Sequence, residues 1–98
     1  GDDLLLYQIA DQLLDQGKPH WARLYSSRLI DENTGVDADD LFLHLLILNK
    51  IGESAEAVEI TEALLDDALQ DDDQVSARNY RRIIKELKTR RRAKISYS

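Results

Sequence analysis

The stretch ADDLFLHLLILNKIG, residues 38–52, decides the fold. From Leu41 to Leu48 the only polar side chain is that of His44. A helix that is apolar on nearly every side has to be covered on nearly every side. We therefore expect an all-α domain in which this segment is the central helix and the other segments pack around it.

The flanking sequence predicts four further helices, because apolar residues recur there at helical spacing. They cover about 3–16, 19–32, 54–69 and 74–89. Gly17 and Gly52 can adopt the left-handed conformation that ends a helix, and they follow the first and the central helix. Pro19 suits the first turn of the second helix, and Ser54 is predicted to be the N-cap of the fourth.

Acidic residues mark two further helix starts. Asp37 followed by Asp40 is a weaker relative of the capping box and precedes the central helix. Asp71, Asp72 and Asp73 are predicted to open the last helix, where the helix dipole favours carboxylates. Residues 95–98 are expected to be frayed.

Composition bounds the class of protein. A chain of 98 residues with 43% apolar and 33% charged residues is one soluble globular domain. The absence of cysteine excludes disulfides, thiolate zinc sites and a cysteine nucleophile. No apolar run approaches the roughly 20 residues that cross a bilayer. We expect a cytoplasmic or nuclear location and, because Gly1 leads a chain without methionine, a piece of a longer protein.

Charge is distributed unevenly along the chain. Residues 1–73 hold 18 acidic and 4 basic side chains, whereas residues 74–98 hold 1 acidic and 9 basic ones. The basic end therefore either lies on the acidic body or is offered to an acidic partner.

The first half of the sequence matches the second half after a shift of 35 residues. The matched pairs stand at helix-face and turn positions, as repetition of a helix–turn–helix unit predicts. They are Leu6 and Leu41, Tyr7 and Phe42, Leu13 and Leu48, Gly17 and Gly52, Ala22 and Ala57, and Leu29 and Leu64.

These positions resemble the tetratricopeptide repeat family, whose units are two antiparallel helices with a period close to this one. The resemblance implies a right-handed stack of two helical hairpins with a C-terminal capping helix. Its parts are repeat one at about 3–36, repeat two at about 38–70, a basic helix at about 73–92 and a tail at 93–98. A generic helical bundle and another α-solenoid are the alternatives.

The resemblance also implies that the first helix of each unit lines a concave surface that binds a protein segment. The residues expected to line or edge it are Tyr7, Gln8, Asp11, Phe42, Leu46, Asn49 and Lys50. The subgroup that clamps a terminal carboxylate uses Lys and Asn here, whereas the first unit of this chain has Tyr7, Gln8 and Asp11. An extended or helical segment with apolar anchors and some basic residues therefore suits this surface better than an acidic tail.

Candidate chemical sites in the sequence favour structural roles. His44 has no ligand or catalytic partner at a suitable spacing, so an interior or groove histidine is expected, and His20 is expected at the surface. Ser26 and Ser27 lie mid-helix without a glycine elbow, which argues against acyl transfer. The acidic stretch at 31–39 resembles a calcium loop, but Phe42 replaces the terminal glutamate. We expect no enzyme, no cofactor and no metal site.

The basic C-terminal segment has three possible roles. Its cations are Arg81, Arg82, Lys85, Lys88, Arg90, Arg91, Arg92 and Lys94. The helix could cover the last hairpin with its cations facing the acidic helices, bind a protein partner, or bind the phosphate backbone of a nucleic acid. The cluster also resembles a nuclear import signal.

The sequence as a whole favours a non-catalytic scaffold or adaptor that binds a protein segment or a copy of itself. A homodimer is possible through Leu4, Leu5 and Trp21 at the N-terminal end of the stack. A nucleic-acid-associated domain is the alternative. Neither a membrane nor a small-molecule substrate is expected as a partner.

Overall fold

The computed structural model consists of five helices, and the structure describes residues 2–32 and 37–96. The helices are α1 Asp2–Asp15, α2 Pro19–Glu32, α3 Ala38–Ile51, α4 Ser54–Gln70 and α5 Gln74–Arg90. No strand occurs in these two ranges. The predicted all-α class and the predicted number of helices are confirmed.

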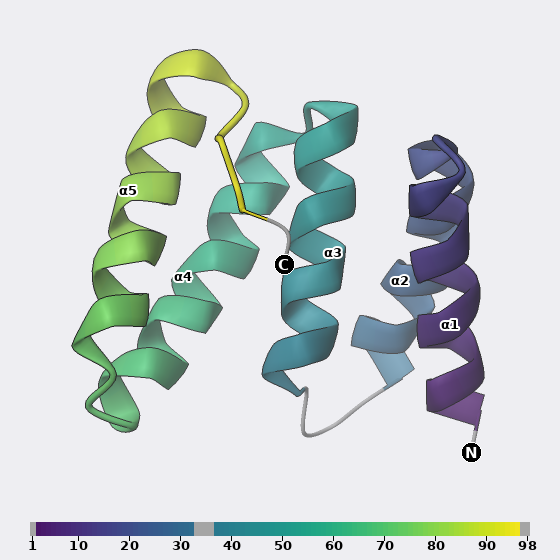
Figure 1. Ribbon diagram of the computed structural model, residues 1–98, viewed down its shortest axis with the longest axis horizontal. Coiled ribbons are helices and arrows are strands. Elements are labelled where there is room, and N and C mark those ends of the chain that lie inside the picture. The colour runs from purple at the N-terminus through teal and green to yellow at the C-terminus, as the bar shows by residue number, and fades with distance from the viewer. Residues whose placement is uncertain (1, 33–36, 97–98) are drawn as a thin grey trace.

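Helix α3 stands in the middle of the molecule (Figure 1). It contacts α1 and α2 on one side and α4 on the other, while α5 packs on α4 at the far end. The chain after α5 turns back and runs between α5 and α3 (Figure 1). Each helix thus packs on the next one along the chain, which is the arrangement that consecutive helical hairpins produce.

The apolar run of α3 supplies both halves of the core. Every side chain from Leu43 to Leu48 is buried. Leu45 and Leu48 belong to a cluster with α4, α5 and Ala93, which we call the C-terminal cluster. Leu43 and Ile47 belong to a second cluster with Ala10 and Ala22 of the first hairpin, which we call the N-terminal cluster. This explains why almost no polar side chain is tolerated between Leu41 and Leu48.

Three pairs of residues that match after the shift of 35 are fully buried at both positions, although Leu13 is half-buried where Leu48 is fully buried. Ala22 and Ala57 are both fully buried, as are Leu29 and Leu64. The pair Ser26 and Thr61 is also fully buried, and the Thr61 hydroxyl donates a hydrogen bond of 2.7 Å to the carbonyl of Ala57. At these three pairs the sequence repeat is also a repeat of burial.

Four of the described helices, α1, α3, α4 and α5, end in the left-handed backbone conformation at the residue that follows the helix or its cap. Gly17 and Gly52 have φ values of +75° and +90°, as predicted for the ends of α1 and α3. At the end of α4 the same role falls to Asp72, with φ of 55°. There the amide of Asp73 donates to the carbonyl of Ala68 and the amide of Asp72 donates to that of Leu69. This pair of bonds is the Schellman motif, which is usually built on glycine.

Two of the predicted caps are wrong. Ser54 is the first residue of α4, and Glu53 is its N-cap without a side-chain bond, because the turn after Gly52 is one residue shorter than the sequence suggested. Of the three aspartates at 71–73, Asp71 caps the end of α4, Asp72 forms the turn, and only Asp73 caps α5 by accepting a bond from the amide of Ser76. Asp37 does cap α3, through the amide of Asp39.

Replacing Asp72 by glycine is expected to stabilise the protein. A non-glycine residue in the left-handed region is strained, so Asp72→Gly should raise the free energy of unfolding by about 0.5 to 1 kcal/mol, or the Tm by about 2 to 8 °C. The reverse change, Gly17→Ala, should lower the Tm, because an added Cβ meets no atom within 4 Å and only the backbone conformation opposes it. Thermal unfolding by circular dichroism measures both. A lower Tm for Asp72→Gly would contradict the argument.

Candidate protein-binding groove

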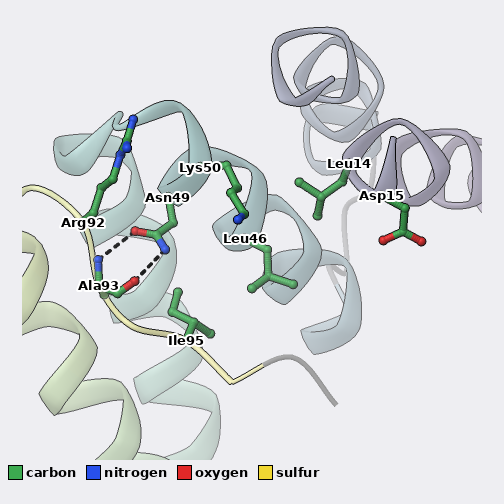
Figure 2. A pocket seen from close by; sticks show the side chains of 8 residues that line it. All are labelled: Leu14, Asp15, Leu46, Asn49, Lys50, Arg92, Ala93 and Ile95. Atoms are coloured by element: carbon green, nitrogen blue, oxygen red, sulfur yellow. Dashed lines mark hydrogen bonds between the residues drawn. The ribbon is translucent and has the colours of Figure 1, made fainter. Parts of the chain in front are cut away.

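A groove lies beside the C-terminal half of α3. It is a cavity of about 520 Å³ lined by Leu14, Asp15, Leu46, Asn49, Lys50, Arg92, Ala93 and Ile95. Leu46, Asn49 and Lys50 share a face of α3 because they are spaced at i, i+3 and i+4. Figure 2 shows that α1 brings Leu14 and Asp15 to the side of the groove opposite residues 92–95.

Asn49 holds the backbone of Ala93 by two hydrogen bonds (Figure 2). Its Nδ2 donates to the Ala93 carbonyl at 2.8 Å, and its Oδ1 accepts from the Ala93 amide at 2.8 Å. The side-chain amide thereby satisfies both polar groups of one residue, as a neighbouring β-strand would. This contact depends on the backbone and not on the identity of the side chain.

Residues 91–96, which we call the tail, follow α5, and three of them, Arg92, Ala93 and Ile95, line one side of the groove. Arg91 ends α5 in the left-handed conformation with φ of 69°, which turns the chain back toward α3. The amide of Lys94 donates to Oε1 of Glu86 at 2.9 Å. Ala93 is buried and Ile95 packs against the C-terminal cluster, so the prediction that the chain is frayed from residue 95 is wrong at Ile95.

The seven predicted groove residues fall into two groups. Leu46, Asn49 and Lys50 line the groove, and they are respectively buried, half-buried and exposed. The other four are not among the residues that line it. Phe42 packs against the C-terminal cluster and Tyr7 against the N-terminal cluster, while Gln8 is exposed and Asp11 is half-buried.

Carboxylates gather near the start of α3. Burial raises the pKa of Tyr7, and the carboxylates of Asp11 and Asp39 raise it further. Burial also raises the pKa of Asp40, with added repulsion from Asp37 and Asp3. The N-terminal ends of α1 and α3 are therefore acidic, whereas Lys50 and Arg92 are at the groove near the C-terminal end of α3.

The basic side chains of the last helix and tail are on the surface. Arg81, Arg82, Lys85, Lys88, Arg90, Arg91, Arg92 and Lys94 are all exposed, as is Arg78. The helix is fixed instead by its apolar face, where Ile83 and Leu87 are buried and Tyr80 packs against the C-terminal cluster. Arg82 pairs with Glu86 within α5 itself. Helix α5 thus covers the last hairpin through apolar contacts and leaves its cations exposed.

A polar network, buried at Ser26 and His44 and partly exposed at Arg23 and Glu56, joins α2, α3 and α4. His44 of α3 is 4% exposed, and its Nδ1 lies 2.7 Å from the hydroxyl oxygen of Ser26 in α2. Its Nε2 lies 3.6 Å from Oε2 of Glu56 in α4. Arg23 donates to the other oxygen of Glu56 at 2.8 Å. The geometry suits an imidazole that carries its hydrogen on Nε2 and accepts the hydrogen of the Ser26 hydroxyl at Nδ1.

The network contains a hydroxyl, an imidazole and a carboxylate in sequence, but the described residues around it lack an oxyanion-binding site. Ser26 is fully buried in the middle of α2, where the backbone amides are engaged in the helix and cannot bind an oxyanion. Burial lowers the pKa of His44 against the opposing effect of Glu56, so the imidazole is neutral at pH 7. The expected interior histidine is confirmed, and its partner Ser26 was not predicted.

Neither a metal centre nor a membrane-spanning helix is found in the part of the chain that the structure describes. No group of three or more His, Asp or Glu side chains within 2–32 and 37–96 is placed to hold a metal ion. Of the proposed calcium loop, Asn33 and Gly35 lie outside the described residues, while Asp37 caps α3. None of the described helices combines the length and apolarity that crossing a membrane requires.

The chain was compared with family models, curated proteins and solved structures. None of them matches it. The resemblance to tetratricopeptide repeats and the handedness of the stack therefore stay predictions, and the functional argument depends on the geometry alone.

Proposed function

We propose that the chain is a non-catalytic protein-binding module that takes a segment of another protein into the groove beside α3. The observation that supports this most directly is the pair of hydrogen bonds between Asn49 and the backbone of Ala93. A groove that holds one extended segment by its backbone has the chemistry to hold another. Leu14 and Leu46 supply an apolar floor, and Asp15 and Lys50 supply charges at its edge.

Site-specific photo-crosslinking tests this proposal. A benzoylphenylalanine at Lys50, which is exposed at the groove, should give covalent adducts with partner proteins in cells. The same group at Glu62, which is exposed on α4, is the matched control and should give none. Adducts that are absent at position 50, or equally frequent at both positions, would contradict binding in the groove.

Self-association is supported at the opposite end of the molecule. Leu4, Leu5, Trp21 and Leu24 are between 56% and 62% exposed. Trp21 matches Glu56 after the shift of 35 residues, and Glu56 is the residue through which the second hairpin meets Arg23 of the first. Trp21 therefore lies where a hairpin of this chain receives a neighbour, and large exposed apolar groups favour covering it.

The self-association prediction concerns Trp21 and Leu24. We expect sedimentation velocity to show a concentration-dependent dimer for the native chain, and Trp21→Lys with Leu24→Lys should abolish it, because both changes put charge into the apolar contact. Val75→Lys is the control, since Val75 is 81% exposed on α5 at the other end. A native chain that stays monomeric at high concentration would rule this contact out.

A second candidate function is binding of a nucleic acid backbone by α5. Arg78, Arg81, Arg82, Lys85 and Lys88 are exposed at helical spacing, so they form a basic stripe along one side of the helix. The acidic residues of the rest of the chain oppose the approach of phosphates.

Oligonucleotide titration tests this second candidate. Labelled duplex and single-stranded oligonucleotides should bind more weakly as salt rises, with log K falling by about 0.9 per log unit of salt for each phosphate contacted in duplex DNA. The double change Arg81→Glu with Lys85→Glu should remove binding. Lys18→Glu, in the connection between α1 and α2, is the control and should not remove it. Binding that is unaffected by salt or by the α5 changes would exclude the stripe as the site.

A further inference from the structure

The tail lies along one side of the groove and contacts α3 in the way that a bound peptide would. After Arg91 it makes no helical hydrogen bonds, and its backbone is held by side chains of other elements. Asn49 binds both backbone polar groups of Ala93, and Glu86 accepts from the amide of Lys94. The contacts of the tail therefore show directly which kind of segment fits.

The contacts of the tail define three requirements for a segment that binds at its position. The residue bound by Asn49 needs an amide hydrogen, which excludes proline, and a small side chain, because Ala93 is only 9% exposed. The residue two positions later is aliphatic, since Ile95 packs against the C-terminal cluster. The preceding residue is arginine, and the Arg92 guanidinium lies over Gly52, 3.5 Å from where a Cβ on that glycine would stand. The pattern is arginine, small, any residue, aliphatic.

The groove is larger than the part that the tail contacts. A cavity of about 520 Å³ extends from Arg92, Ala93 and Ile95 to Leu14 and Asp15 of α1 (Figure 2). A segment with this pattern and with further side chains that reach Leu14 would bury additional apolar surface. A suitable partner can therefore make every contact that the tail makes and add others.

We propose that the tail is an internal competitor for the groove, and that an extended segment of another protein with the pattern arginine, small, any residue, aliphatic displaces it. This inference depends on the proposed function, because it assumes that the groove binds protein segments. Asn49 recognises the backbone of either segment. A partner segment therefore has to bind with a more favourable free energy than the tail does.

The test uses a fluorescent peptide with the sequence of residues 91–96, RRAKIS, titrated into the full chain. In the variant Ala93→Glu with Ile95→Glu the tail cannot seat, because one carboxylate enters the buried position of Ala93 and the other enters the half-buried position where Ile95 packs against the C-terminal cluster. If the tail fills the native groove at least nine-tenths of the time, the peptide should bind this variant about tenfold or more tightly than the native chain. Adding Asn49→Leu should remove binding, and the peptide RRPKIS should not bind.

The outcomes separate this inference from the function on which it depends. Equal affinity for the native chain and the tail variant would overturn competition by the tail, while leaving groove binding intact. Lack of binding to either protein, together with no crosslinks at position 50, would overturn both. Circular dichroism confirms that each variant is folded before titration.

A second measurement needs no variant. In the native chain the amides of Ala93 and Lys94 are bonded to Asn49 and Glu86, so their hydrogen exchange is slowed. Saturating peptide should accelerate exchange at both amides, because the displaced tail is exposed to water. The amide of Ala77, within α5, is the internal control and should not change. Unchanged exchange at Ala93 under saturation would overturn the proposal.

Discussion

Leu45→Ala is expected to lower the free energy of unfolding by about 2 to 5 kcal/mol, because truncation of a buried leucine loses its transfer energy and leaves a cavity. Leu45 of α3 is fully buried in the C-terminal cluster, where it packs with residues of α4 and α5. A domain of this kind has a total stability of about 5 to 15 kcal/mol, so this single change removes a large part of it. Urea denaturation followed by circular dichroism measures the loss.

The matched control is Leu5→Ala, because Leu5 is 56% exposed on α1. It should change the free energy of unfolding by less than about 0.5 kcal/mol. Ile47→Ala, in the N-terminal cluster, should cost as much as Leu45→Ala, since both residues are on the central helix. A Leu45→Ala protein as stable as Leu5→Ala would contradict the central position of α3.

The second large effect is a dependence of stability on pH that comes from His44. Burial holds the pKa of His44 in the folded protein below its ordinary value of 6.5. Unfolding therefore takes up a proton as the pH falls below that value. The contribution of the neutral imidazole is fully present above pH 6.5 and is lost as the pH falls toward the folded pKa, by about 1.4 kcal/mol for each unit between the two pKa values.

The measurement is urea denaturation of the native chain and of His44→Gln at pH 7.5 and at pH 5. The stability of the native chain should fall between these values, and the fall should be smaller in His44→Gln. His20→Gln, at an exposed position, is the control and should retain the native dependence. If the free energy of unfolding falls by the same amount in all three proteins, His44 is not the source of the pH dependence.

The network around His44 can also be dissected by a double-mutant cycle. Ser26→Ala removes the hydroxyl that lies 2.7 Å from Nδ1, and His44→Leu removes the imidazole. Because each single change leaves a buried polar group without its partner, each should cost about 1 to 3 kcal/mol. The double variant should cost less than the sum of the two, and an additive result would mean that the two side chains do not interact.

Periodicity predicted the helices well, because five amphipathic or apolar segments left little choice. The bounds of α2 match the prediction, and the glycines after α1 and α3 have the expected backbone conformation. The turns between α3 and α5 were harder to predict. Glu53 and Ser54 are adjacent, and which of them stands at the N-cap of α4 depended on the length of the preceding turn.

The candidate site was predicted only in part. The resemblance to tetratricopeptide repeats predicted Leu46, Asn49 and Lys50 as groove residues, and all three line the groove. The partner of Asn49 could not be predicted, because residues 49 and 93 are brought together by the turn at Arg91, a residue that rarely adopts positive φ. The sequence did contain a signal for the contact between His44 and Ser26. Ser26 is a second polar residue at a core position, and two such residues are expected to bond to each other.

The two core clusters differ in which parts of the chain supply their residues. Every residue of the C-terminal cluster comes from α3 or from the chain that follows it, whereas the N-terminal cluster borrows Leu43 and Ile47 from α3. During synthesis the ribosome releases α1 and α2 before α3 exists outside the exit tunnel. Until α3 has been synthesised, the apolar face of the first hairpin is therefore exposed to chaperones and proteases.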